Sequence, residues 1–453
     1  MTTHHNRRMM NLGAFVHETG QHVAAWRHPD AYAESGTVFA QALDVARTAE
    51  RGKFDLLFLA DSAAISTHGS AESRGRMGKV VKFEPITVLS ALAAVTTRLG
   101  LVATCTSTYN EPYTLARQFA SLDQISGGRA GWNLVTSNNE AEAFNHGRDK
   151  HAAHADRYDR AAEFAEVVTG LWDSWDEDAF IRDKESGVYY DTEKLHVLNH
   201  QGRHFSVRGP LNVARSPQAR PVLVQAGASD TGRDLAARLA ELVFTAQTTF
   251  EQAREFYGDV VARLPRHGRS RQEMKILPGL YPVVGRTEAE AREKFEFLQS
   301  LIHPSVGLAV LEHTIGVANL SQYPLHGPVP DLADTNGPLS RQRLLLEAAR
   351  RDKLTLWELC LLNAGPRGHL LSIGTPSQIA DVMEHWFRNG AADGFNVMPA
   401  FLPGSLDDFV DMVIPELQRR GLFRTEYEGK TLRENLGLPK PVSRWARMPM
   451  VAE

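Results

Sequence analysis

The clearest chemical signal in the sequence is a turn that follows an apolar run near the middle of the chain. Residues 221–227 have the composition of a buried strand, and Ala228 and Ser229 follow directly, with Gly232 at the start of a helical pattern. Gly227, the Ser229 hydroxyl and a helix N-terminus would together supply backbone donors, a side-chain donor and the positive end of a dipole. These groups predict a phosphate site. A serine that only caps an ordinary helix would give the same pattern.

A second polar cluster lies where another helical pattern begins, at 151–158. His154 and Tyr158 are four residues apart, so they share one face of a helix. A metal site is disfavoured, because His151 lies only three residues before His154 and no zincin-type pattern accompanies the pair. A phosphate or flavin contact suits His154, Arg157 and Tyr158 better, and the alternative is a solvated helix start.

Polar side chains also occur at the ends of other apolar runs. Asp61 comes directly after one run and Thr104 lies near the end of the next, while Asn133 and Ser137 belong to the run after that. In a barrel of parallel strands, the C-terminal strand ends carry the chemistry. The alternative for Thr104 and Asn133 is that they only satisfy backbone groups. Cys105 has no base nearby in sequence, so its expected role is packing.

The elements that must position these residues alternate between short apolar runs and helical patterns. Eight runs are predicted to be strands, at 10–16, 54–60, 99–105, 130–136, 221–227, 242–247, 276–284 and 394–399. Most are apolar almost throughout, as expected of strands buried on both faces. Helices are predicted at 38–51, 113–125, 155–171, 232–240, 287–300 and 376–389. This order predicts an α/β fold, a (β/α)₈ TIM barrel, with an open doubly wound sheet as the alternative.

Three segments are longer than a barrel needs, at about 62–85, 138–216 and 286–374. Each follows the C-terminal end of a predicted strand, the face where barrels build active sites. We therefore expect one barrel domain over 1–453, with these insertions covering a substrate site. Loops without a role in the site, or loops that join subunits, are the alternative.

The composition limits the class of protein. With 23% charged residues, a formal net charge of -4 and no basic stripe, the chain is not expected to bind nucleic acid. No basic leader and no apolar run approaching 18 residues is found, so no membrane segment is expected. Two cysteines are too few for a disulfide framework, which suits a reducing compartment. These features predict a cytoplasmic protein.

Several stretches match one family in order and spacing. They include AWRHP at 25–29, FLAD at 58–61, TYNEPY at 108–113, GWNLVTS at 131–137, HADRY at 154–158, VQAG at 224–227 and FRTEY at 423–427. With them, the chain resembles the bacterial-luciferase-like flavin monooxygenases. Within that superfamily it is most similar to the branch of nitrilotriacetate, dibenzothiophene-sulfone and long-chain alkane monooxygenases. The aminopolycarboxylate-type members are the nearest match, as in NHGRD at 145–149.

The resemblance implies a site and a reaction. By motif match, the FMN contacts fall on Asp61, Thr104, Ser137, His154, Tyr158, Ser229 and the backbone of Gly227 and Ala228. Thr104 and Asn133 match positions that line the oxygen pocket in relatives, so they are the predicted catalytic residues, and no metal is expected. FMN would arrive reduced from a separate NADH-dependent flavin reductase and react with O₂ and a small organic substrate. Relatives of this kind commonly form homodimers or homotetramers.

The substrate is the least constrained part. Four cations follow the second predicted strand, namely Arg74, Arg76, Lys79 and Lys82. Facing a barrel mouth, they would favour an anion, and a solvated charged loop is the alternative. Oxidative C–N cleavage of an aminopolycarboxylate-like compound is therefore the first hypothesis. C–S cleavage of an organosulfur compound such as a sulfone is the second.

Other functions stay open as well. They are a non-catalytic flavin-binding relative, a deazaflavin-dependent dehydrogenase and a metal-dependent barrel hydrolase. Histidines that could act as acid or base in the site are His17, His22, His303, His313 and His369.

Overall fold

Eight parallel strands close into a barrel in the computed structural model, which describes residues 8–447 except 35, 66–68, 138 and 333–338. The barrel strands, in order around it, are β1 (Asn11–Val16), β2 (Leu56–Leu59), β3 (Gly100–Thr106), β4 (Ala130–Val135), β7 (Val222–Gln225), β8 (Leu242–Thr245), β9 (Lys275–Val284) and β11 (Gly394–Val397). The ring closes because β9 pairs with both β8 and β11, and β11 pairs with β1. All eight predicted strands are confirmed, and the open-sheet alternative is wrong.

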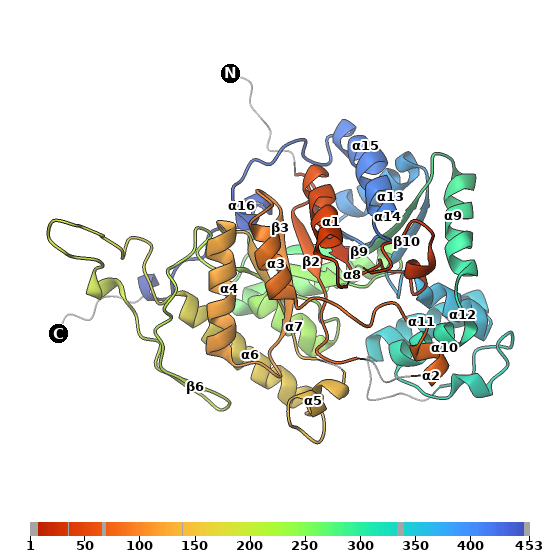
Figure 1. The fold of residues 1–453 in the computed structure, drawn as a ribbon, viewed down its shortest axis with the longest axis horizontal. Helices are drawn as coiled ribbons and strands as arrows, with labels where there is room; N and C mark the ends of the chain where they lie inside the picture. The colour runs from red at the N-terminus through yellow and green to blue at the C-terminus, as the bar shows by residue number, and fades with distance from the viewer. Residues whose placement is uncertain (1–7, 35, 66–68, 138, 333–338, 448–453) are drawn as a thin grey trace.

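Helices surround this barrel (Figure 1). They are α1 (Phe39–Arg51), α3 (Pro85–Ala93), α4 (Pro112–Ser126), α6 (His154–Trp172), α7 (Asp230–Leu239), α8 (Phe250–Arg263), α9 (Glu288–Ser300) and α13 (Pro376–Arg388). Outward-facing strand residues such as Leu101 and Trp132 pack against Phe119 and Phe164 of these helices. The six predicted helices are present. Of the eight helices just named, α3 and α8 were not predicted.

The barrel interior is apolar and is closed at the N-terminal ends of the strands by the short helix α16 (Leu432–Asn435). Leu432 belongs to the same buried cluster as Leu56 and Val102. It comes so close to the strands that a Cβ atom on Gly100 would lie 2.5 Å from its Cδ1. Glycine at position 100 therefore makes room for a plug at this end of the barrel.

The segments beyond the barrel lie after β2, β4 and β9. The first holds α2 (Ala71–Arg74), and the second holds α5 (Ala141–Asn145), α6 and the hairpin of β5 (His200–Gln201) and β6 (Ser206–Val207). The predicted first residue of the second segment, Asn138, lies outside the described residues. The third holds α9, α10 (Pro304–Ile315), α11 (Leu339–Asp352), α12 (Leu356–Ala364) and β10 (Leu370–Gly374). Figure 1 shows α2 beside the α10–α12 group, and α2 contacts α10.

Strand β10 was not predicted. It pairs in parallel with the second half of β9, outside the ring of eight, so that β9 serves both.

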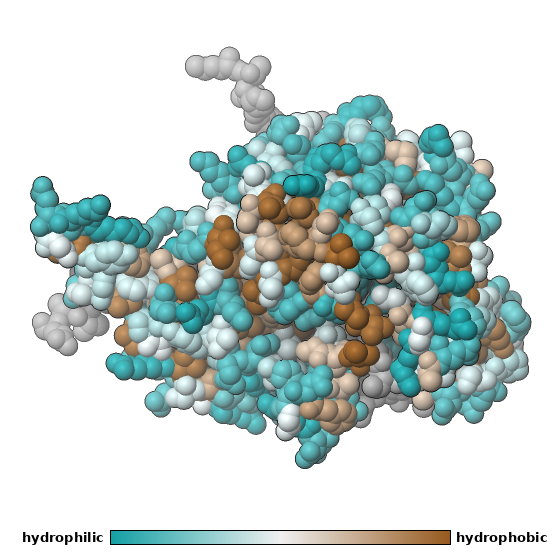
Figure 2. All heavy atoms as spheres, in the orientation of Figure 1, coloured by the Kyte–Doolittle hydropathy of each residue, from teal (hydrophilic) through white to brown (hydrophobic). Residues whose placement is uncertain are grey.

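The surface is mainly polar on the face that Figure 2 shows, with a few apolar areas near its centre. Within the described part of the chain, no helix has the length and apolarity needed to cross a bilayer.

Candidate active site

The turn between β7 and α7 has the features expected of an anion site. Ser229 is the N-cap of α7, and its Oγ accepts a hydrogen bond from the backbone N–H of Gly232 (3.1 Å). The Ser229 hydroxyl proton therefore remains available to a ligand. A Cβ atom on Gly227 would lie 2.3 Å from Nε2 of Gln225 and 2.9 Å from Cα of Gly232, so only glycine fits this turn. The Ala228 carbonyl accepts from Nε of Arg233 (3.0 Å), which holds the turn against the helix.

The start of α6 provides a second set of groups. The rings of His154 and Tyr158 lie 4.6 Å apart, as expected for two residues on one helix face. Burial, and secondarily the charge of Arg157, lowers the pKa of His154. Nε of Arg157 is buried and has no hydrogen-bond partner among the described residues. Because α6 and α7 are in contact, this helix start and the Ser229 turn belong to neighbouring elements.

Thr104 and Asn133 form a pair inside the barrel. They face each other across β3 and β4, and Nδ2 of Asn133 donates to Oγ1 of Thr104 (2.9 Å). Both residues are 4% exposed. Oδ1 of Asn133 is buried without a partner among the described residues. An unsatisfied buried amide oxygen costs about 1–3 kcal/mol, so a ligand that donates to it would be bound favourably.

Ser137 is linked to Ser62, the residue after Asp61, by a residue that was not predicted, Glu142. This carboxylate is 3% exposed and accepts hydrogen bonds from the hydroxyls of Ser62 (2.8 Å) and Ser137 (2.6 Å). The Ser137 hydroxyl also lies 2.8 Å from Oγ1 of Thr106, so neighbours already engage it. Burial raises the pKa of Asp61, opposed mainly by the charge of Lys82.

A cluster of three phenylalanine rings lies at the C-terminal end of the barrel interior. The Phe15 ring is 4.9 Å from both Phe58 and Phe244. His369, in the turn before β10, stacks on Phe244 with ring centroids 5.0 Å apart. A turn from the third insertion therefore reaches into the barrel mouth.

Three of the five candidate histidines, His17, His22 and His369, are at this mouth. Burial lowers the pKa of His17, and the charges of Lys79, Arg367 and Lys82 lower it further. Burial also lowers the pKa of His22 to about 4, although a hydrogen bond with Gln299 acts in the opposite direction. The other two histidines are on α10, where His303 is the N-cap and His313 is exposed.

The predicted cations divide into two pairs. Nζ of Lys79 donates to the Gln21 carbonyl (2.6 Å), and Lys82 lies 3.7 Å from Glu18, so both approach the barrel mouth. Arg74 instead donates to the Gly69 carbonyl, and Arg76 pairs with Glu72 in the same helical segment.

Cys105 agrees with its expected packing role. Burial raises the pKa of its thiol, which therefore stays protonated.

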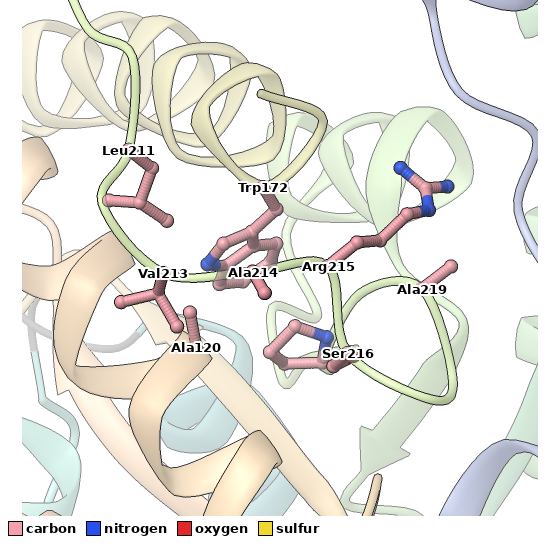
Figure 3. Close-up of a pocket in the computed structure, with 9 residues that line it drawn as sticks. Ala120, Trp172, Leu211, Val213, Ala214, Arg215, Ser216 and Ala219 are labelled. Atoms are coloured by element: carbon pink, nitrogen blue, oxygen red, sulfur yellow. The ribbon is translucent and has the colours of Figure 1, made fainter. Parts of the chain in front are cut away.

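Two cavities lie away from these groups. The smaller, about 10 Å³, is bounded by Ala120, Trp172 and the 211–221 segment (Figure 3) and has room for about one water molecule. The larger, about 300 Å³, lies between the end of β9, α9 and the 400–408 segment. Neither is lined by the predicted site residues, although His28 of the AWRHP stretch borders the larger one.

Residues 19–393 match the luciferase-like monooxygenase family. The chain belongs to this family. It is 51% identical over 443 residues to N-acetyl-S-(2-succino)cysteine monooxygenase of Bacillus subtilis, covering 97% of this chain and 99% of the relative. It is 50% identical to nitrilotriacetate monooxygenase component A of Aminobacter aminovorans, covering 96% and 97%. Identity to dibenzothiophene-sulfone monooxygenase of Rhodococcus erythropolis is 46%, covering 96% and 98%.

Solved structures agree with this assignment. EDTA monooxygenase from Chelativorans superposes with a TM-score of 0.82 at 33% identity, covering 96% of this chain and 99% of that chain. A riboflavin lyase bound to modified FMN and riboflavin gives a TM-score of 0.83 at 31% identity, covering 95% and 96%. The chain is therefore an enzyme of the monooxygenase class on a luciferase-like barrel, as the sequence motifs predicted.

Proposed function

We propose that this enzyme is the oxygenating component of a two-component system, which binds reduced FMN and uses O₂ to oxidise a small organic anion. The observation that carries the proposal is the buried, unpartnered Oδ1 of Asn133 beside Thr104 in the barrel of a luciferase-like monooxygenase. This oxygen offers a buried acceptor to a hydrogen-bonding ligand. The Ser229 turn offers an anion site on the next strand of the barrel.

These residues fit FMN. Ser229, the backbone of Gly227 and Ala228, and the side chains of His154 and Tyr158 would hold the phosphate, with Arg157 nearby. Asp61, Thr104, Asn133 and Ser137 would then lie along the flavin ring. Reduced FMN supplies the electrons with which oxygen is activated. The role of this chain is to orient flavin and substrate and to exclude water from the barrel mouth.

The sources of electrons and the assembly are part of the same proposal. A separate NADH-dependent flavin reductase would deliver reduced FMN, in keeping with the name "component A" of the nitrilotriacetate relative. We expect both proteins to work in the cytoplasm, and the barrel, one domain over 1–453 with its three insertions, to form a homodimer or homotetramer.

Anaerobic titration with reduced FMN tests the cofactor site. Ser229→Ala removes the hydroxyl that would donate to the phosphate and should weaken binding by about 1–3 kcal/mol. Thr249→Ala is the matched control, because Thr249 caps the neighbouring helix α8 in the same way. The proposal fails if wild-type protein does not bind reduced FMN. Equal affinities for the two variants would remove only Ser229 from the site.

The reaction can be tested by mass spectrometry of products. Reduced FMN, oxygen and a panel of amino-carboxylates, sulfones and thioethers should yield an oxygenated product or a cleavage pair, and we favour C–N cleavage of an aminopolycarboxylate-like substrate. C–S cleavage is the second candidate, because the sulfone monooxygenase is nearly as similar as the nitrilotriacetate enzyme. FMN binding without oxygen consumption on any substrate would instead indicate a non-catalytic relative.

A further inference from the structure

We propose that Lys79 and Arg367 bind two carboxylates of the substrate, so that this enzyme selects a small organic molecule with at least two negative charges. The inference rests on the proposed function, because it places the substrate at the same barrel mouth. It goes beyond that function by assigning the two residues that recognise the substrate and the number of charges that they require.

Lys79 is held at the mouth by contacts along its own segment. Nε1 of Trp26 donates to the Arg76 carbonyl (3.1 Å), and the Trp26 ring packs so closely on Gly78 that a Cβ atom there would lie 2.5 Å from it. These contacts fix the backbone just before Lys79. Its ammonium group then donates to the Gln21 carbonyl (2.6 Å), which uses one of its three protons.

Arg367 belongs to the turn between α12 and β10, which approaches the same segment, because a Cβ atom on Gly365 would lie 3.3 Å from Cδ2 of His22, the neighbour of Gln21. That turn is fixed on the mouth, because His369 stacks on Phe244 and Gly365 lies against the hydroxyl of Tyr281. Nε of Arg367 and the hydroxyl of Tyr281 are both buried, and neither has a hydrogen-bond partner among the described residues. A guanidinium with free donors is suited to a carboxylate, which it can bind through two parallel hydrogen bonds.

The two cations lack carboxylate partners. In the described part of the chain, neither Lys79 nor Arg367 lies within 4.0 Å of an acidic oxygen, whereas Lys82 lies 3.7 Å from Glu18. Desolvation lowers the pKa of Lys79 and the charge of Arg367 lowers it further, whereas the charge of Glu18 raises it. Burial similarly lowers the pKa of Arg367, again opposed by the charge of Glu18. Lys79, Lys82 and Arg367 are partly buried and share the charge of Glu18, so two substrate carboxylates would neutralise the excess positive charge.

A neutral substrate would not relieve them. An uncharged sulfone or alkane would displace the remaining water from both cations without supplying a negative charge. The arrangement therefore selects against such substrates. The unpartnered Tyr281 hydroxyl could donate a further hydrogen bond to the same carboxylate as Arg367.

The test is a calorimetric titration of the full chain with succinate, iminodiacetate and nitrilotriacetate, each compared with its full methyl ester, and with dibenzothiophene sulfone. At least one acid should bind, and more tightly than its ester and the sulfone. Arg367→Gln and Lys79→Gln should each weaken that acid about 10- to 150-fold, as expected for one charged hydrogen-bonding partner. Arg367→Lys should be weakened less, because it keeps the charge.

Arg286→Gln is the matched control, since this arginine is exposed on the surface and pairs with Glu290. Thermal unfolding checks that each variant folds, and if one of the two does not, the other decides. The proposal is overturned if no acid binds, if acid and ester bind equally, or if the variants behave like the control. Binding of reduced FMN is measured separately. If the wild-type protein does not bind reduced FMN, the proposed function is rejected, whereas the comparison of acid with ester still tests the roles of Lys79 and Arg367.

Discussion

The two ends of this barrel use buried charge in opposite ways. At the N-terminal end, Asp55 is fully buried but meets Arg424 at 2.6 Å, and Glu241 meets Arg433 at 3.0 Å. At the C-terminal end, Nε of Arg367 is buried without a hydrogen-bond partner, and no carboxylate lies within salt-bridge distance of this arginine among the described residues. The first arrangement pairs buried carboxylates with arginines of the same chain. The second is the one that the proposed substrate would complete.

Two buried side chains, Arg129 and Asn133, differ in their hydrogen bonding. Arg129, 2% exposed near the N-terminal end, donates to the carbonyls of Ala93, Thr96, Leu99 and Ser126 at 2.7–3.0 Å. The amide oxygen of Asn133, buried toward the other end, accepts nothing from the described residues. Each end can therefore be perturbed separately.

Removing a charge from the N-terminal end should have the largest effect on stability. Arg424→Met leaves Asp55 buried with the Leu12 N–H and Asn11 as its remaining partners among the described residues, and breaking such a pair costs about 3–5 kcal/mol. Urea unfolding at pH 7 measures this loss. The double variant with Asp55→Asn should recover much of it, and an unchanged midpoint in the single variant would contradict the comparison.

The plug should be the next most sensitive feature. Leu432→Ala removes a fully buried side chain from between the strands and leaves a cavity, with an expected loss of about 2–5 kcal/mol in the free energy of unfolding. Affinity for reduced FMN should not change, because the plug lies at the opposite end from the proposed flavin site. A large change in that affinity would show that the two ends are coupled.

Acid should destabilise the C-terminal end through His22. Its pKa is about 4 in the folded protein and about 6.5 when unfolded, so below pH 6.5 the unfolded state binds a proton that the folded state excludes. This residue should therefore lower the free energy of unfolding by up to about 3 kcal/mol as the pH falls from 6.5 to 4. His22→Gln, followed by urea unfolding across that range, should flatten the dependence. An equally steep profile would contradict the assignment.

Much of the fold could be predicted because its signals are local. The barrel strands are apolar runs buried on both faces, and α6 has its apolar residues at helical spacing. Helix α3 has no polar face to reveal it, since PITVLSALA is apolar almost throughout. Strand β10 is five residues long and pairs with the second half of β9. This pairing depends on tertiary structure, so no local pattern predicts it.

The site was predictable only in part for the same reason. Thr104 and Asn133 could be selected because they are polar residues near the ends of apolar runs. Their hydrogen bond follows from the register of β3 and β4. Arg367 and Tyr281 lie far apart in sequence, and no local pattern indicates that they meet at the barrel mouth. The four loop cations could be recognised as a group, but which of them face inward depends on Trp26 and Gln21, which hold the segment in place.

The smallest expected effect on stability comes from removing a charge at the C-terminal end. Arg367→Met deletes a cation whose pKa burial already depresses and which has no carboxylate partner among the described residues, so no acidic group loses a salt bridge. We expect the free energy of unfolding to change by less than about 1 kcal/mol, or to rise, because a poorly solvated charge is replaced by an apolar chain of similar length. Urea unfolding beside Arg424→Met makes the comparison direct. A loss of about 3 kcal/mol or more would mean that Arg367 supports the fold, and that the two ends do not differ in the way argued.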